Sequence, residues 1–378
     1  MARTDTLGNF LTDVAIAIRN KKGTTDTIVA SNFDTEIESI ETGGGTTEPI
    51  FTGHYDTEGL RQIGWTDEEI EYYQQNGVQW NSSEDEYFKL TQTELAGDDS
   101  KNTRFIPKNS TKTSFASYYK LLAIPQLDTS NVTTMENMFS HCYSLTMMPQ
   151  LDTGNVTSMN NMFYDCYSLK TIPQLDTSNV TNMNNTFNGC YSLKTIPQLD
   201  TGNVTSMDNM FSSCRSLTTI PQLNTGNVTS MNNMFASCSS LETVPQLNTS
   251  NVTSIASMFA SCSSLETVPQ LDTSNVTSIV NMFANCSSLK TLGGLLNLGQ
   301  AYKTTTSANS YSYKVDLSGS PKLTEQSLIN ILNNLYDIAT KGCKTQQVIL
   351  GSTNLAKLTS EEGQQALSNA QVKGWTVS

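Results

Sequence analysis

Apolar residues return every 24 positions between residues 125 and 292, and this period dominates the chain. The phenylalanines that mark it are Phe139, Phe163, Phe187, Phe211, Phe235, Phe259 and Phe283. A cysteine follows each of them, at Cys142, Cys166, Cys190, Cys214, Cys238, Cys262 and Cys286. A fixed period of this length indicates a repeat protein whose copies stack on one another.

One unit, taken as residues 169–193, predicts a short strand, a turn and a short helix. Residues 169–172 suit a strand that ends at Pro173, because proline cannot donate to a sheet ladder. The following Asp-Thr-Ser-Asn has the composition of a turn. Residues 183–190 show the i, i+4, i+7 spacing of one or two helical turns. Such a unit cannot bury its apolar side chains alone, so we expect each side chain to meet its own copy in the next coil.

Polar residues recur with the same period, and most of them are interpreted as parts of the scaffold. Stacked Asp carboxylates could hold Ca²⁺, but Asn224 and Asn248 replace two of them, which favours Asx turns. These aspartates are Asp128, Asp152, Asp176, Asp200 and Asp272. The Asn of each N-V-T, formally a glycosylation motif, is expected to bond the turn backbone instead.

The cysteines are interpreted as a buried ladder of small apolar side chains. An odd-numbered column cannot pair completely into disulfides. Zinc needs local clusters of Cys or His, and the two histidines, His54 and His141, are isolated in the sequence. The chain therefore predicts no metal and no cofactor. It also shows no nucleophile–base pair and no phosphate loop, so no enzyme is predicted.

Two columns change along the array and are the candidate binding residues, with ordinary solvated surface as the alternative. The first contains Tyr143, Tyr167, Tyr191 and Arg215, and continues as Ser239, Ser263 and Ser287. The second contains Lys170, Lys194, Thr218, Glu242, Glu266 and Lys290. Tyrosine offers a flat apolar face and a polar tip, which suits contact with sugar or protein.

The array is flanked by divergent segments. Subtracting 24 from the repeat positions gives Phe115, Tyr118, Leu121 and Ile124, so residues 105–124 form a degenerate first coil. Residues 293–378 predict a cap with strands at 313–317, 347–350 and 375–377. Its helices are predicted at 323–339 and at 359–370, the second beginning at Thr359.

The N-terminal residues predict an anchoring segment and a small domain. Residues 1–45 contain two short amphipathic helices and a glycine hinge, and they need a partner: a second copy of the chain or a larger assembly. The first helix presents Leu7, Phe10, Leu11, Val14 and Ile18. Residues 46–104 form a small acidic, aromatic-rich domain in which Thr66 is expected to cap a helix.

Charge and hydropathy exclude some partners. The 378 residues carry a net charge of −13. Most of the excess acid lies in residues 1–104, which argues against nucleic-acid binding through clustered Lys and Arg. No apolar run is long enough to span a membrane, and residues 1–22 lack the apolar region of a secretory signal.

The repeat D-x-S-N-V-T-x-M-x-x-M-F-x-x-C-x-S-L resembles the BspA-like branch of the leucine-rich repeats, with Thr186 as one departure. The resemblance implies an α/β solenoid: a right-handed leucine-rich repeat of seven 24-residue coils with divergent caps at 105–124 and 293–378.

Both ends of the chain carry a second resemblance. F-L-T-D-V-A-x-A-I-R near the N-terminus, and S-P-K-L-T-E-Q-S-L and K-G-W-T-V-S near the C-terminus, resemble tail-associated proteins of phages and prophages. This implies a virion-surface tail protein that docks on a virion or tail protein through residues 1–45. Its solenoid would present a surface to a host cell-surface protein or glycan. The alternatives are a bacterial BspA-like cell-surface adhesin and a purely structural virion component.

Overall fold

The structure is a computed structural model that describes residues 60–61, 64–75, 105–106, 114–301, 314–341 and 346–378. The predicted anchoring helices of residues 1–45, with Leu7, Phe10, Leu11, Val14 and Ile18, lie outside the described residues.

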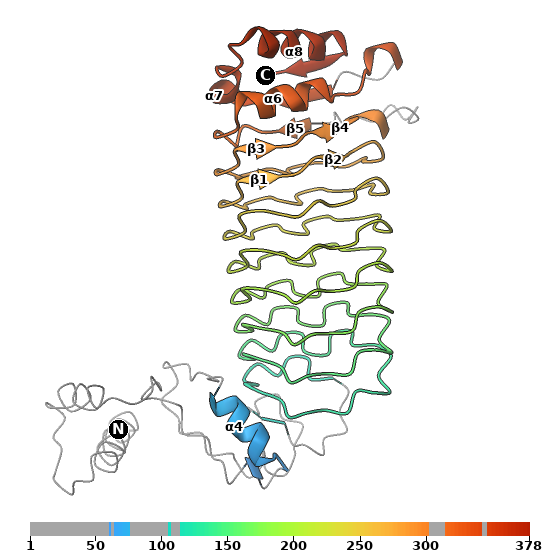
Figure 1. The fold of residues 1–378 in the computed structure, drawn as a ribbon, viewed down its shortest axis with the longest axis vertical. Helices are drawn as coiled ribbons and strands as arrows, with labels where there is room; N and C mark the ends of the chain where they lie inside the picture. Colours follow the sequence, from blue (N-terminus) through green and yellow to red (C-terminus); the bar gives the residue numbers. More distant parts are fainter. Residues whose placement is uncertain (1–59, 62–63, 76–104, 107–113, 302–313, 342–345) are drawn as a thin grey trace, which may run out of the picture.

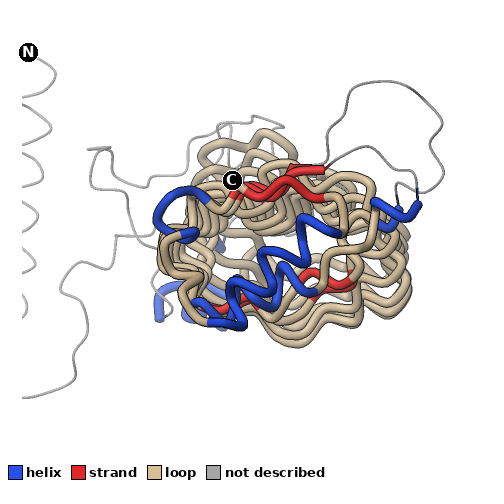
Figure 2. Tube along the Cα trace, turned by 90° about the horizontal axis from the view of Figure 1, so that it is seen from above, coloured by secondary structure: helices blue, strands red, loops and turns tan. Residues whose placement is uncertain are grey.

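From Phe115 onward the chain winds into a stack of coils, one for every 24 residues (Figure 1). Isolated parallel bridges join equivalent positions of successive coils, such as Ser158 with Asn182 and Asn182 with Ser206. The Phe rings from Phe115 to Phe283 stack with centroids 5.6–5.8 Å apart and planes within 4–14°. Seen down the stack, the coils largely overlie one another (Figure 2). The prediction that identical side chains stack, including the degenerate first coil, is confirmed.

The short helix predicted in each coil is wrong, because residues 183–190 form consecutive turns instead. Asn185 (φ 55°) and Gly189 (φ 78°) are in the left-handed region, which interrupts a right-handed helix every four residues. The backbone N–H groups then alternate in direction. That of Phe187 donates to the Met210 oxygen of the next coil (2.9 Å), whereas that of Cys190 donates back to Phe187 (3.1 Å).

The predicted strand is regular only at the C-terminal end of the stack. There β1 (Thr267–Val268) pairs in parallel with β3 (Thr291–Leu292), and β2 (Leu271–Asp272) with β4 (Leu295–Leu296). Gly293 donates its N–H to Val268 (2.9 Å), a bond that the proline at this position of the earlier coils cannot make. The α/β description therefore fails for the coils, which consist of turns and isolated bridges.

The C-terminal segment covers one end of the stack (Figure 1). Its parallel sheet has the order β5-β6-β7, with β5 at Lys314–Asp316, β6 at Gln346–Ile349 and β7 at Trp375–Val377. Its helices are α6 (Glu325–Asn333), the short η3 (Ala339–Lys341), α7 (Gly351–Leu355) and α8 (Glu361–Val372).

Two helix boundaries differ from the prediction. Helix α6 ends at Asn333 because the chain leaves it to pair with the last coil, where the Tyr336 N–H donates to Leu298 (3.0 Å). Helix α8 is capped by Ser360 and not by Thr359, since the Ser360 hydroxyl accepts from the Gly363 N–H (3.0 Å).

At the opposite end, α4 (Asp67–Gln75) lies against the first coil. Thr66 caps it as predicted: its hydroxyl accepts from the Glu69 N–H (3.2 Å), while Glu69 accepts from the Thr66 N–H (2.7 Å). The Trp65 indole donates to Ile106 (2.8 Å), and the Gln126 N–H donates to Glu69 (3.2 Å). The boundary predicted at residue 104 stays a prediction.

Candidate binding site

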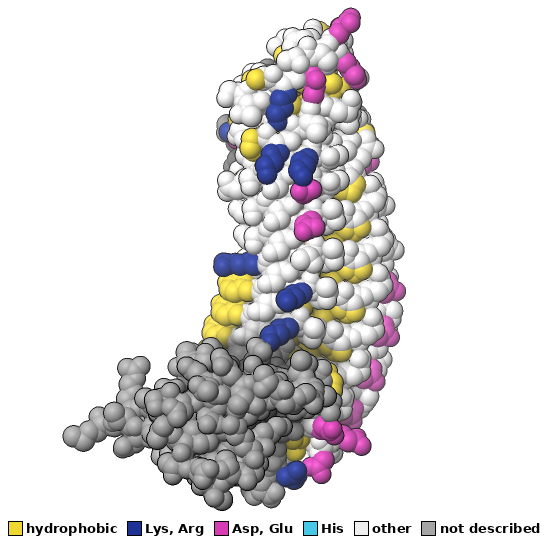
Figure 3. Space-filling view, turned by 60° about the vertical axis from the view of Figure 1, so that its left-hand side comes forward, with side chains coloured by type: hydrophobic (Ala, Val, Ile, Leu, Met, Phe, Trp, Pro, Cys, Tyr) yellow, Lys and Arg dark blue, Asp and Glu magenta, His cyan; other side chains and the backbone are white. Residues whose placement is uncertain are grey.

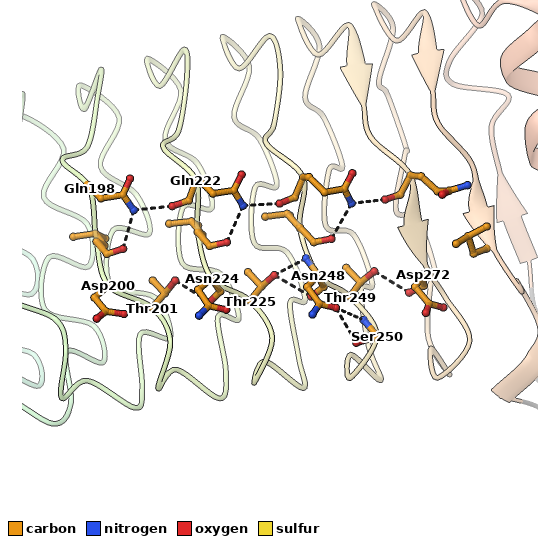
Figure 4. A pocket seen from close by; sticks show the side chains of 16 residues that line it. Gln198, Asp200, Thr201, Gln222, Asn224, Thr225, Asn248, Thr249, Ser250 and Asp272 are labelled. Carbon is orange, nitrogen blue, oxygen red and sulfur yellow. Dashed lines mark hydrogen bonds between the residues drawn. The ribbon is translucent and has the colours of Figure 1, made fainter.

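The recurring polar side chains bond neighbouring coils to one another. A groove of about 900 Å³ is lined by residues between 198 and 296, and Figure 4 shows the side chains along it. Along it the Gln222 amide donates to the Gln246 carbonyl (2.7 Å), and the Thr225 hydroxyl donates to the Asn248 carbonyl (2.9 Å). Equivalent bonds recur in the other coils. The groove is therefore lined by groups that already serve the stack.

The Asp and Asn columns also have the predicted structural roles. Asp176 accepts from the Ser178 N–H (3.0 Å) in an Asx turn, and Asn224 accepts from the Gly226 N–H (3.2 Å) in the same way. Hydrogen bonds from Ser178 lower the pKa of Asp176. Asn179, which begins an N-V-T, donates to the Gly154 carbonyl of the previous coil (2.8 Å). Within the described residues, no group of His, Cys, Asp or Glu is arranged to hold a metal ion.

Seven cysteines form the predicted buried ladder, and all seven are free thiols. Each Sγ donates to the Phe carbonyl of the previous coil, as Cys190 does to Phe163 (3.3 Å). Burial raises the pKa of Cys142 and of Cys286 to about 12. These thiols are neutral at physiological pH and are not nucleophiles.

We expect the free energy of unfolding to fall as the pH rises from about 9 towards 12. An unfolded Cys142 loses its proton near pH 9.0, while the folded form holds it until about 12. The unfolded state then binds fewer protons, so each such thiol removes up to about 1.4 kcal/mol per pH unit. Urea titrations between pH 8 and 11 would measure this slope. Replacing Cys214 and Cys238 with Ala should make it shallower, and an unchanged slope would contradict the assignment.

The tyrosine column predicted from the sequence exists as a stack of rings. The rings of Tyr143 and Tyr167 lie 4.7 Å apart at 3°, and those of Tyr167 and Tyr191 lie 4.6 Å apart at 5°. The Arg215 guanidinium lies over the Tyr191 ring, 4.4 Å from its centroid. Tyr119 extends the stack, 5.2 Å from Tyr143. Tyr119 was missed, although subtracting 24 from Tyr143 finds it. We call these five residues the tyrosine strip.

Stacking changes what the tyrosine strip can offer to a ligand. The inner ring faces cover one another, and Arg215 covers a face of Tyr191. The flat apolar face expected from the sequence is thus used inside the strip. The exposed parts are ring edges and phenol groups. Figure 3 shows such a hydrophobic column along one edge of the stack, with Lys and Arg side chains next to it.

One flank of the strip carries a cluster that the sequence did not reveal. The Nδ1 of His141 lies 3.4 Å from an Asp165 carboxylate oxygen, and its ring meets Tyr164 edge-on at 5.1 Å. Burial and the Asp165 charge raise the pKa of Tyr167 to about 12, and the Tyr167 phenol lies within hydrogen-bonding reach of the Asp165 carboxylate. His141 is isolated in the sequence but not in the fold.

The second predicted column divides into two halves. Lys170 and Lys194 are exposed in the coils of Tyr167 and Tyr191. Glu242 and Glu266 lie further along the stack, where Glu266 pairs with Lys290 (2.7 Å). Among the described residues, neither the Lys194 ammonium nor the Arg215 guanidinium has a hydrogen bond or an ion pair.

Comparison with known proteins places the array in a described family. The model of a family described as "Mycoplasma protein of unknown function, DUF285" matches residues 109–220 and 205–306, which together make up just over half of the chain. A solved leucine-rich-repeat protein of T. pallidum is 15% identical. That match covers 61% of this chain and 84% of the other, with a TM-score of 0.31. No curated protein matches.

Proposed function

We propose, from the premise that this chain belongs to the family described as "Mycoplasma protein of unknown function, DUF285", that it is a surface-recognition protein. It is a leucine-rich-repeat protein of the BspA-like kind. Its tyrosine strip binds a cell-surface glycan or protein, and the remaining columns serve as the scaffold.

The observation that carries this proposal is the contrast between the strip and the other recurring columns. The Gln, Thr and Asn side chains bond neighbouring coils, and the Asp side chains close turns. The strip tyrosines instead lie at the surface, where Tyr119 is 44% exposed and Tyr143, Tyr167 and Tyr191 are half-buried. Tyrosine and arginine are the residues most often responsible for binding energy at interfaces.

The protein would lie on the surface of either a phage virion or a bacterial cell. A phage tail protein docked through residues 1–45 fits the resemblance of both chain ends, and its strip would meet a bacterial surface. A bacterial adhesin of the BspA-like kind fits the repeats equally well, and its strip would meet an animal host. Immunodetection of the native protein in purified virions or in cell envelopes separates these locations.

Replacing Tyr143, Tyr167 and Tyr191 with Ser is expected to weaken cell binding at least about tenfold, since each tyrosine in such a contact contributes about 1 kcal/mol or more. The substitution copies Ser239, so the coil fold is retained. Labelled full-length protein would be titrated onto bacterial envelopes and onto animal epithelial cells.

The matched control replaces Glu242 and Glu266 with Gln, further along the stack, and should bind as the parent does. Binding that depends on these glutamates instead would move the site to the C-terminal half. No saturable binding to either surface would favour the purely structural alternative. The helices in the described ranges are all too short or too polar to span a bilayer.

A further inference from the structure

Stacking leaves the ring edges and phenol groups of the tyrosine strip for contact with a ligand. An aromatic ring is negative on its face and positive at its edge, and the inner faces lie against one another at 4.6 and 4.7 Å. The edges and the phenol groups are what a ligand meets. A tyrosine phenol is protonated at physiological pH, and burial raises the pKa of Tyr143 further above its ordinary value. The strip therefore offers O–H donors and ring edges to a ligand, and not ring faces.

The C-terminal end of the strip adds two cationic groups, Arg215 and Lys194, that have no hydrogen bond or ion pair within the described part of the chain. Arg215 is exposed and rests on Tyr191, which fixes its guanidinium while leaving its N–H groups open. Lys194 follows Tyr191 by three residues in the same coil and is also exposed. Lys170 occupies the same position one coil earlier. This is a local excess of positive charge on a chain whose net charge is −13.

We propose that Arg215 and Lys194, together with the phenol of Tyr191, form a subsite for the anionic groups of an acidic polysaccharide. Arg215 and Lys194 bind a carboxylate or sulfate, and the Tyr191 phenol donates to a hydroxyl or ring oxygen of a neighbouring sugar. The inference rests on the proposed function, because it assigns the ligand class of the same strip.

The spacing of the strip favours a polysaccharide over an acidic peptide. Side chains on one side of an extended peptide recur every ~6.7 Å, whereas the phenols recur with the ring spacing of 4.6–4.7 Å. The side chains of a peptide lying along the strip would therefore not coincide with successive phenols. A sugar chain presents oxygens on every ring and needs no such match.

The Asp165 carboxylate determines on which side of the strip an anion can bind. Asp165 faces His141 at 3.4 Å and would repel an anion there. Its side chain also lies over Gly189, where an added Cβ would collide with an Asp165 carboxylate oxygen. The subsite therefore lies between Arg215 and the lysine side of the strip.

Replacing Arg215 with Ser and Lys194 with Thr tests the subsite in the full-length protein. Both substitutions copy the next coil, at Ser239 and Thr218, so the fold is retained. Binding to hyaluronate, which carries carboxylates, and to heparin, which also carries sulfates, would be measured by biolayer interferometry. We expect at least about a tenfold loss on one or both, because hydrogen bonds to charged groups are the strong ones. Wild-type binding should weaken as salt is raised. The control K290T removes a lysine of the same column outside the strip. It should leave binding to hyaluronate and heparin unchanged.

Each alternative result overturns a stated part of the inference. Equal binding of neutral dextran would remove the anionic requirement, and equal binding of poly-glutamate would remove the preference for sugar. Unchanged binding of hyaluronate and heparin by the double variant would remove the subsite. If replacing Tyr143, Tyr167 and Tyr191 with Ser still weakens binding of the protein to cells, the proposed function survives any of these outcomes. If the parent binds no cell surface, the proposed function fails instead.

Discussion

A chain that lacks residues 221–232, half of one coil, is expected not to fold, whereas a chain that lacks residues 221–244 is expected to fold normally. The longer deletion joins Ile220 to Pro245 and restores the sequence of the array. Every column then continues with its own residue type, and Phe211 stacks on Phe259. The shorter deletion removes Leu223, Val228 and Met231. It also shifts all following residues by half a coil, so that they no longer align with the equivalent residues of the preceding coil.

The reason is that the stack has nearest-neighbour energetics, so a whole coil can be removed without damage to the rest. Differential scanning calorimetry and circular dichroism would compare the two. We expect the Tm of the 24-residue deletion to fall by less than about 5 °C, and the 12-residue deletion to show no cooperative transition. A 12-residue deletion that melts cooperatively near the parent Tm would mean that the buried columns do not determine the fold.

Replacing Phe187 with Ala is expected to lower the free energy of unfolding by about 3–5 kcal/mol. Its side chain is 1% exposed and stacks on Phe163 at 5.7 Å and on Phe211 at 5.6 Å. The truncated side chain leaves a cavity, because the backbone on both sides is held to the adjoining coils and cannot collapse into the space. Urea denaturation followed by circular dichroism would measure the loss.

Phe187→Leu is the matched control, since it keeps most of the apolar volume and should cost clearly less. A third variant, Tyr167→Ser, removes an aromatic side chain of similar size that is only half-buried, and it should also cost less. If Phe187→Ala were no more harmful than Tyr167→Ser, the interior Phe ladder would not be the main source of stability.

The buried columns could be predicted because each is repeated seven times with the same chemistry. A side chain that packs against the equivalent side chain of the next coil must be of the same type in every coil. The structural roles of Phe187, Cys190 and Asn179 could therefore be predicted from their recurrence. The three C-terminal strands and the helices α6 and α8 were also predicted, because their apolar residues follow the usual strand and helix periods. The short α7 (Gly351–Leu355) was missed.

The helix predicted at residues 183–190 shows where this reasoning fails. Apolar spacing alone cannot distinguish a helical turn from successive turns that place the same residues inward. The information was in Asn185 and Gly189, two residues that tolerate a positive φ. The carbonyls that replace the helical acceptors come from the adjoining coil, and no local pattern records them.

The candidate site was predicted in part. The membership of Tyr143, Tyr167, Tyr191 and Arg215 in one column follows from counting, and the structure places them together. The sequence does not show that the stacked rings cover one another's faces, because that depends on how the rings are oriented. His141 and Asp165 differ in residue type at equivalent positions, so their proximity required coordinates.

The tyrosine strip runs parallel to the long axis of the stack and stops partway along it, at Arg215. A filamentous ligand that follows the strip must lie alongside the protein and cannot be gripped at its tip. If the strip binds as proposed, the protein would lie lengthwise against its ligand, and the coils beyond Arg215 would add no contacts of the strip.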